Sequence, residues 1–334
     1  MSTIEWTDET WNPVTGCTRA SPGCDHCYAV TMTRRLEAMG QEKYAGLVNP
    51  GKGHFNGVVR THPDELDRPL RWKRPRHVFV NSMSDLFHKD VPFEFVDRVF
   101  AVMALARDHT FQVLTKRPDR MAAYFAGAEP AENDPDPTPR DRRFAVADAL
   151  SERVGLDHPC RGHVVDDLED GTNWPLPNVW LGTSTEDQPA ADERVSDLLR
   201  CPAAVRFLSC EPLLGPVSLR RWLYSVEDVD PDPYRTTLDE VPYNQGLDWV
   251  IVGGESGPSA RPCELALVRA LVEECSAAGV PVFVKQLGDR PVWSDSADDM
   301  AFCHRPDRAP KGKDPAQWPA DLRVREWPAP RVPA

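Results

Sequence analysis

The chain has 334 residues, with 39 Lys and Arg against 52 Asp and Glu and a formal net charge of -13. This length suits one large α/β domain or two ordinary ones. It excludes a mini-protein that needs disulfides or a bound metal to fold. The acidic total argues against a uniformly basic nucleic-acid coat but leaves room for a local basic face. The 33 prolines exceed the usual share of about 5% and predict long loops or tails beside the core.

No run approaches the roughly 20 apolar residues of a membrane span, and the N-terminus, MSTIEWTDET, lacks the basic and apolar regions of a signal peptide. We therefore expect a cytoplasmic protein without a membrane partner. In that compartment the 9 cysteines are expected to be free, catalytic or metal-bound rather than paired in disulfides.

Short apolar runs, each followed by a polar cluster, recur along the chain at 77–80, 111–114, 179–181, 205–208, 249–252 and 280–284. Such runs are typical of strands buried on both faces of a parallel sheet. Helical patterns lie between them at 93–107, 190–200 and 265–278. The alternation is typical of a βα barrel or a doubly wound sheet, and in both, ligands bind at the carboxyl ends of the strands. We expect an α/β fold, a partial (βα)6-type barrel with parallel strands over residues 1–288.

Two acidic, proline-rich insertions interrupt this pattern, at about 126–177 and 224–246. We interpret both as solvated excursions, apart from a helix expected at 143–154. Residues 289–334 are expected to form an irregular C-terminal extension. Three tryptophans are the expected anchors of this tail on the domain: Trp293, Trp318 and Trp327.

The most specific motif is a triplet of cysteines at C-x6-C-x2-C, formed by Cys17, Cys24 and Cys27. The x2 spacing lets two thiolates from one turn bind one metal centre, and Gly16 gives the loop curvature to return the third. Two interpretations stay open, a zinc site completed by a histidine and a 4Fe–4S cluster with one iron lacking a protein ligand. His26 abuts Cys27 and would strain to share a zinc ion.

A three-cysteine loop near the N-terminus, followed by about six βα units, resembles the radical S-adenosylmethionine superfamily. The resemblance implies a 4Fe–4S cluster whose open iron binds S-adenosylmethionine, and an external electron donor whose reduction of the cofactor yields a deoxyadenosyl radical. This sequence differs in its first spacer, six residues instead of three, and in carrying His26 where an aromatic residue precedes the last cysteine. A longer loop can still converge on a cluster, and the His26 imidazole can stack on an adenine.

The chain also resembles an uncharacterised family of phage and bacterial gene products of unknown function. The residues that carry this likeness are WNPVTGC, PGCDHCYA, NSMSDLFH, VLTKRPDRM, LPNVWLGTSTEDQ, RFLSCEPLLGP, WVIVGGESGPSARP and VFVKQLG. Together they span about residues 5–288.

The superfamily resemblance also suggests cofactor-binding residues. The loop after the second strand would lie beside the cofactor's amino group, where Ser82, Ser84 and Asp85 offer acceptors. Alternatively, Asp85 caps the turn that follows it. Ser184 and Glu186 would hold the ribose hydroxyls or the methionine carboxylate, although Glu186 also fits an acidic residue in the first turn of a helix.

Other polar residues at the predicted strand ends are assigned to catalysis or substrate. Glu255 follows two glycines that allow close backbone approach to a ligand, and Lys116 and Lys285 would add cations to the same rim. Cys210 would quench a radical or donate hydrogen, unless it is a buried free cysteine acting as a small hydrophobic residue.

A nucleic acid or nucleotide is the candidate substrate, because residues 68–77 combine basic side chains with Trp72, as in surfaces that pair phosphate contacts with base stacking. The plainer interpretation is a basic entrance to a strand. Two other functions stay open beside a radical S-adenosylmethionine enzyme. One is a zinc-stabilised, non-catalytic nucleic-acid-binding or interaction protein, and the other is a metal-independent barrel hydrolase that uses Asp85, Glu211 and Glu255.

Overall fold

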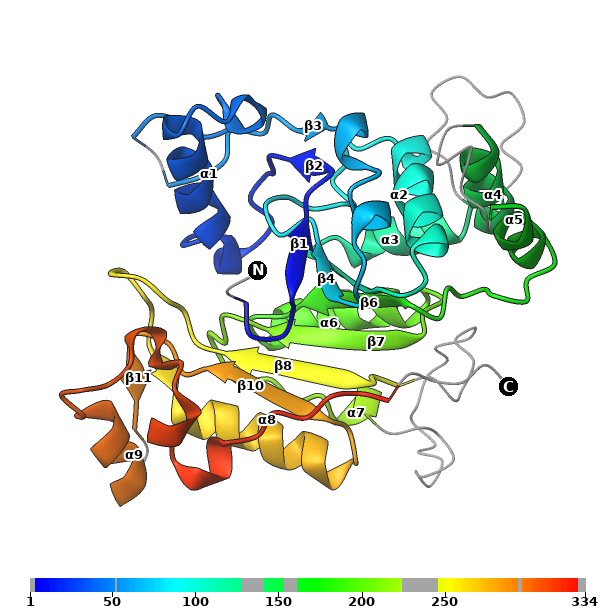
Figure 1. Cartoon of the computed structure of the whole chain (residues 1–334). Helices are drawn as coiled ribbons and strands as arrows, with labels where there is room; N and C mark the ends of the chain where they lie inside the picture. The colour runs from blue at the N-terminus through cyan, green and yellow to red at the C-terminus, as the bar shows by residue number, and fades with distance from the viewer. Residues whose placement is uncertain are drawn as a thin grey trace. The chain divides into compact units, whose positions relative to one another are not determined.

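The computed structural model describes residues 4–51, 53–127, 141–152, 161–223, 246–293 and 296–329. Its strands are β1 (Glu9–Trp11), β2 (Val14–Thr15), β3 (Arg60–Thr61), β4 (His77–Val80), β5 (Thr110–Thr115), β6 (Val179–Ser184), β7 (Val205–Cys210), β8 (Trp249–Gly253), β9 (Cys263–Glu264), β10 (Val282–Gln286) and β11 (Pro291–Val292). Its α-helices are α1 (Tyr28–Ala38), α2 (Phe93–Leu105), α3 (Pro118–Phe125), α4 (Arg142–Glu152), α5 (Arg161–Glu169), α6 (Gln188–Leu199), α7 (Arg220–Leu223), α8 (Leu265–Ala277) and α9 (Ala297–Cys303) (Figure 1). Within these residues, no helix is both long and apolar enough to cross a membrane.

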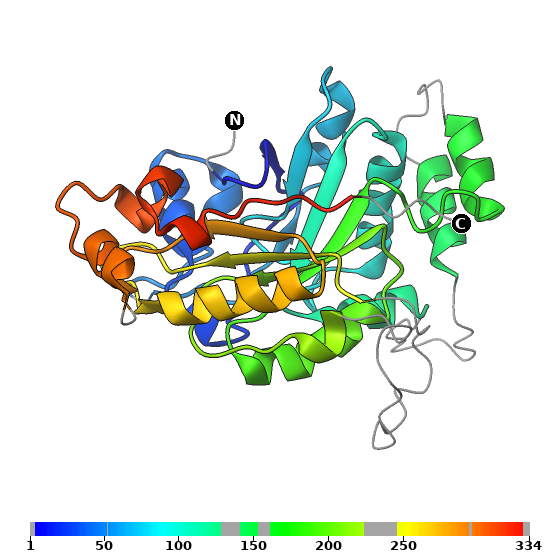
Figure 2. The ribbon, with the colours of Figure 1, turned by 90° about the horizontal axis from the view of Figure 1, so that it is seen from below.

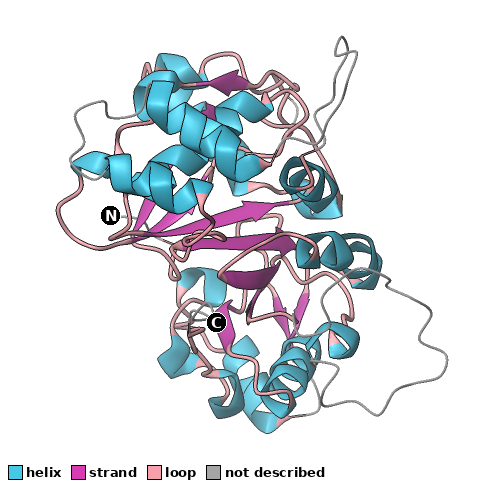
Figure 3. Ribbon diagram, turned by 90° about the vertical axis from the view of Figure 1, so that its right-hand side faces the viewer, coloured by secondary structure: helices cyan, strands magenta, loops and turns pink. Residues whose placement is uncertain are grey.

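Seven strands form one sheet in the order β1-β4-β5-β6-β7-β8-β10. Figure 3 shows these strands in magenta and the helices that alternate with them in cyan. The pairs β1/β4, β4/β5, β7/β8 and β8/β10 are parallel. All six strands predicted from the apolar runs are confirmed, with small shifts at their ends. The seventh, β1, escaped prediction because it has three residues, of which only Trp11 is buried.

The strands succeed one another in the sheet in the order in which they occur in the chain. A doubly wound sheet would instead reverse that order at a switch point. Parallel neighbours need a crossover, and α2, α6 and α8 lie in the connections from β4 to β5, from β6 to β7 and from β8 to β10. The fold is therefore α/β with the topology of a partial βα barrel, as the sequence predicts.

The described residues divide into two compact units, the first drawn from residues 4–181 with 201–204, the second from residues 182–200 with 205–329. In the first unit α2 is buried along most of its length. The helix expected at 143–154 is confirmed as α4, which packs against α2 and α5.

Part of the insertion at 126–177 belongs to the core of the first unit, contrary to the expected solvated excursion. Val146, Leu150 and Leu168 are fully buried, and Arg142 at the start of α4 is only 2% exposed. Charged residues stand among the apolar ones in α4 and α5, so the sequence pattern indicates a surface segment until packing on α2 is known. Residues 128–140 and 153–160 of this insertion lie outside the described part of the chain, as do residues 224–245 of the second insertion.

In the second unit α8 lies along β8 and β10 (Figure 1). The tail runs beside β10, the last strand of the sheet, in Figure 2, and the Val284 amide donates to the Val324 carbonyl over 2.9 Å. Trp327 stacks on Trp249 with ring centroids 5.1 Å apart, and Trp318 is buried. The extension holds β11 and α9 and is otherwise irregular, and its last part covers a sheet edge that would otherwise expose unpaired backbone groups.

Candidate functional site

The cysteine loop is fixed to the rest of the first unit by its glycine. Gly16 has a φ of +86°, and a Cβ there would lie 2.0 Å from the Val58 carbonyl oxygen, so no other residue fits. Gly16 also forms an isolated parallel bridge with Ser84, in the loop after β4. The loop that begins with Cys17 is thereby joined to the carboxyl end of β4, and it ends at Cys27, the N-cap of α1.

The three thiols are half-buried and free of disulfides. Burial raises the pKa of Cys17 to about 12; the charges of Asp85, Cys24 and Cys27 add to the rise, and Arg117 opposes it. Burial likewise raises the pKa of Cys27, against which the amides of Ala29 and Val30 and the Lys116 ammonium act. The charges of Cys24 and Cys27 thus act on the Cys17 thiol, and the charge of Cys24 acts on the Cys27 thiol. Among the described residues, no three His, Cys, Asp or Glu side chains are grouped so that they could hold a single metal ion.

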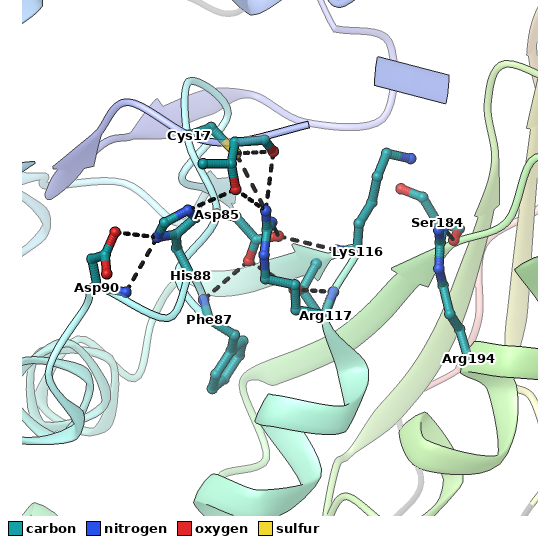
Figure 4. Close-up of polar contacts among 11 residues, drawn as sticks. Cys17, Asp85, Phe87, His88, Asp90, Lys116, Arg117, Ser184 and Arg194 are labelled. Carbon is teal, nitrogen blue, oxygen red and sulfur yellow. Dashed lines mark hydrogen bonds and ion pairs between the residues drawn. The ribbon is translucent and has the colours of Figure 1, made fainter. Parts of the chain in front are cut away.

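Arg117 connects the ends of two strands to the cysteine loop (Figure 4). Its guanidinium donates to Asp85 Oδ2 over 2.7 Å, to the Thr18 carbonyl over 3.0 Å and to Thr18 Oγ1 over 2.8 Å. The same group lies 3.9 Å from Cys17 Sγ, within reach of a hydrogen bond to sulfur. The side chains of Asp85 and Arg117 are 7% and 16% exposed, so this ion pair is shielded from solvent.

Asp85 is occupied by protein partners. Besides Arg117, it accepts hydrogen bonds from Thr115 Oγ1 (2.7 Å) and from the amides of Lys116 (3.2 Å) and Phe87 (3.0 Å). The bond from Phe87 is the turn cap that the sequence offered as the alternative role. Asp85 thus orients Arg117 in the structure. A contact between Asp85 and a cofactor stays a prediction.

His88 supports Thr18 from the other side. Its Nδ1 accepts a hydrogen bond from the Asp90 amide over 3.2 Å, so in a neutral ring Nε2 carries the proton and donates to Thr18 Oγ1 over 2.9 Å. Burial, followed by the charge of Arg117, lowers the pKa of His88 and favours this neutral form. Sequence reasoning did not single out His88 or Thr18, because both matter only through Arg117.

The serines predicted to bind the cofactor lie on the same loop after β4, which reaches the cysteine loop through Gly16. The hydroxyl of Ser84 donates to the Val14 carbonyl over 2.8 Å, and that of Ser82 donates to Asn12 Oδ1 over 3.2 Å. The Tyr28 hydroxyl, next to Cys27, donates to the Ser82 carbonyl over 2.6 Å. Each serine hydroxyl keeps lone pairs that can accept from an ammonium group.

The predicted residues Ser184 and Glu186 lie in the second unit, with Arg194 of α6 between them. The guanidinium of Arg194 donates to the Ser184 carbonyl over 2.7 Å and to Glu186 Oε2 over 3.1 Å. Glu186 is 1% exposed and precedes Asp187, the N-cap of α6, so it is not a first-turn residue of that helix. Its partner in the structure is a buried guanidinium.

Three charged residues predicted for catalysis or substrate are paired in the second unit. Lys285 Nζ lies 3.1 Å from Glu211 Oε1, and Arg261 Nη2 lies 2.6 Å from Glu255 Oε1, so both pairs are ion pairs. Cys210 is fully buried beside the Thr185 hydroxyl, which fits the small hydrophobic residue offered as its alternative role. These pairs lie at the carboxyl ends of β7, β8 and β10, the edge where the sequence predicts ligands.

The two glycines before Glu255 let neighbouring side chains pack against the backbone. A Cβ on Gly253 would lie 2.3 Å from Glu211 Oε1, and one on Gly254 would lie 2.9 Å from Cys263 Sγ. The Glu211 and Cys263 side chains therefore fill the space that the sequence suggested for a ligand.

The basic stretch at 68–77 lies at the opposite end of β4 from Asp85, because it precedes that strand and Asp85 follows it. The guanidinium carbons of Arg68 and Arg76 lie 5.8 and 5.3 Å from the Trp72 ring centroid. Arg76 also pairs with Glu9 over 3.0 Å. The Trp72 ring therefore packs among protein cations, and the contact of this stretch with a nucleic acid stays a prediction.

No curated protein and no solved structure matches the chain. A family model described as "Protein of unknown function (DUF5131)" matches residues 1–313, which include the cysteine loop and the loops after β4 and β5. The expectation of an uncharacterised family is confirmed. Because the match covers far more than half of the sequence, the chain belongs to the family described as Protein of unknown function (DUF5131).

Proposed function

We propose that the protein is a radical S-adenosylmethionine enzyme whose cysteine loop holds a 4Fe–4S cluster. The observation that carries the proposal is the group of three half-buried, disulfide-free thiols of Cys17, Cys24 and Cys27 on one loop. The loop is joined to the carboxyl end of β4, the edge at which βα folds bind ligands. The cluster, once bound and reduced by an external electron donor, supplies the electron that cleaves S-adenosylmethionine.

Three cysteine thiols are the donor set that a 4Fe–4S cluster with one open iron requires, and metal analysis distinguishes such a cluster from a zinc site. Burial raises the pKa of Cys17 and Cys27, so their thiolates form as iron binds, and the Lys116 ammonium, the Arg117 guanidinium and the amides at the start of α1 oppose that rise.

The protein's own groups have separate tasks in this proposal. Ser82 and Ser84 accept hydrogen bonds from the cofactor's ammonium group, and Asp85 holds Arg117 against the loop. His26, which is exposed beside Cys27, offers its ring to the adenine. The roles of Ser184 and Glu186 in cofactor binding, and those of Lys116, Lys285, Cys210 and Glu255 in catalysis, stay predictions.

The test is the metal content of protein purified without oxygen. We expect about four irons and four sulfides per chain, a brown colour with a broad absorption shoulder, and binding of S-adenosylmethionine by calorimetry. Colourless protein with stoichiometric zinc would instead support the non-catalytic interaction protein. Metal-free protein would favour the hydrolase, although Asp85, Glu211 and Glu255 are each paired with a cation in the structure.

For the substrate we propose a nucleic acid, because one exposed basic loop can bind phosphates. In the described part of the chain, Arg71, Lys73 and Arg74 are exposed and take part in no ion pair. This loop and Asp85 lie at opposite ends of β4, a strand of four residues, which separates them by roughly 13 Å at 3.3 Å per residue. A polymer can reach from one to the other more readily than a single nucleotide can.

Replacing Arg71, Lys73 and Arg74 together by Gln should flatten the dependence of single-strand affinity on salt. Each lost phosphate contact changes the slope of log affinity against log salt by about 0.7, so three contacts change it by about 2. The matched control replaces three exposed cations in the second unit, Arg290, Lys311 and Lys313, by Gln and should leave the slope unchanged. Equal slopes for both variants, or no binding by wild-type protein at low salt, would contradict nucleic acid as the substrate.

A further inference from the structure

We propose that Arg117 is a positioning residue that sets the reduction potential of the cluster through Cys17. The inference rests on the proposed function, because it concerns a cluster on the three cysteines. It is carried by one arrangement: a shielded guanidinium that is held by Asp85 and directed at both Thr18 and the Cys17 sulfur.

Arg117 is fixed at both ends of its side chain. Its backbone amide donates to Thr115 Oγ1 over 2.9 Å, while Thr115 donates onward to Asp85. At the other end, Nη1 lies 2.7 Å from Asp85 Oδ2 and 3.9 Å from Cys17 Sγ, so the carboxylate orients the same nitrogen that meets the sulfur. A guanidinium held in this way loses little conformational freedom when it binds a third acceptor.

The contacts exceed what a structural ion pair needs. Asp85 alone would satisfy the charge of Arg117, yet Nη2 donates to two atoms of Thr18, the residue that follows Cys17. His88 donates to the same Thr18 hydroxyl, so the first arm of the cysteine loop is held from two sides. The guanidinium therefore helps to hold the segment of Cys17 and Thr18 in place.

A positive charge beside a ligand sulfur changes the reduction potential of a cluster. Each electron added to a cluster makes it more negative, so a nearby positive charge and a hydrogen bond to sulfur stabilise the reduced state and raise the potential. Because the Arg117–Asp85 pair is shielded from solvent, its charges are screened less than those of exposed groups. Removing the guanidinium should therefore lower the potential, whereas a lysine keeps the charge without the planar fork and should lower it less.

The experiment measures the midpoint potential of the anaerobic holoprotein by dye-mediated titration, with the electron paramagnetic resonance signal of the reduced cluster as the readout. In Arg117→Gln we expect the ratio of reduced to oxidised cluster at a given potential to fall about tenfold, a shift of about 59 mV for one electron. Arg117→Lys should fall between this variant and wild type. The matched control is Arg120→Gln, which removes the same charge from α3; Arg120 lies over the Phe93 ring and donates to the Val91 carbonyl, and in the described part of the chain it has no hydrogen bond to the cysteine loop.

A potential for Arg117→Gln equal to that of wild type or of Arg120→Gln, with full iron content, would overturn the inference and leave the cluster itself intact. If Arg117→Gln does not retain iron, Arg117→Lys decides, and a wild-type potential in that variant overturns the inference. Iron-free wild-type protein would overturn the proposed function, and the inference with it.

Discussion

Alanine in place of Cys17, Cys24 or Cys27 should leave the protein without a stable cluster. Each thiol holds one iron in the proposed site, so each loss removes one of three protein ligands and the remaining two cannot retain it. Iron and acid-labile sulfide, measured on anaerobically purified protein, should fall to the background level in all three variants, and the absorption shoulder should disappear.

The control for this series is Cys303→Ala. Cys303 is a half-buried cysteine in α9, in the second unit, and its thiol belongs to a different part of the fold from the cysteine loop. Iron content in that variant should equal that of wild type. Normal iron in Cys24→Ala would show that the three cysteines are not joint ligands.

The largest expected effect on stability comes from Arg142, which anchors the α4 helix on the core. Its guanidinium donates to the Tyr124 carbonyl over 2.8 Å and lies 3.5 Å from Asp97, whose other oxygen accepts from the Tyr124 hydroxyl. Both charged residues are nearly inaccessible to solvent. Arg142→Ala leaves the Asp97 carboxylate buried without its cation, so the free energy of unfolding should fall by about 3 to 5 kcal/mol.

The neighbouring residue supplies the comparison. Arg143 pairs with Asp141 at the surface, where such pairs contribute at most about 1 kcal/mol. Denaturant titration followed by circular dichroism should therefore give a much lower midpoint for Arg142→Ala than for Arg143→Ala. Equal midpoints would mean that the buried pair does not hold α4 on α2.

The apolar runs predicted the strands correctly because the pattern that marks a buried strand lies within a short segment of the sequence. A strand buried on both faces needs consecutive apolar residues, as 249–252 shows, and such runs are visible without knowledge of any neighbour. The same reasoning missed β1, since Glu9–Trp11 gains its place through parallel pairing with β4 rather than through its own composition. It also misjudged α4, whose burial depends on α2 and on the Arg142 ion pair.

The candidate site also has features that the sequence shows and features that only the structure shows. The spacing of Cys17, Cys24 and Cys27 is local and was read directly from the sequence. That Asp85 would be bound by Arg117, 32 residues further on, depends on β4 and β5 being neighbours in the sheet. The sequence offered this carboxylate as a cofactor ligand or as a turn cap; the structure shows the cap and adds the Arg117 ion pair, and the cofactor contact stays a prediction.

The sequence by itself determined the α/β class, the succession of strands and the cysteine triplet, because backbone periodicity and ligand spacing are properties of short segments. Only the tertiary structure decided which charges are already neutralised: Asp85 by Arg117, Glu186 by Arg194 and Glu255 by Arg261. A charge removed from water needs a partner at hydrogen-bond distance. Which side chain comes that close depends on how the strands and loops are packed, and short segments of the sequence read on their own do not reveal it.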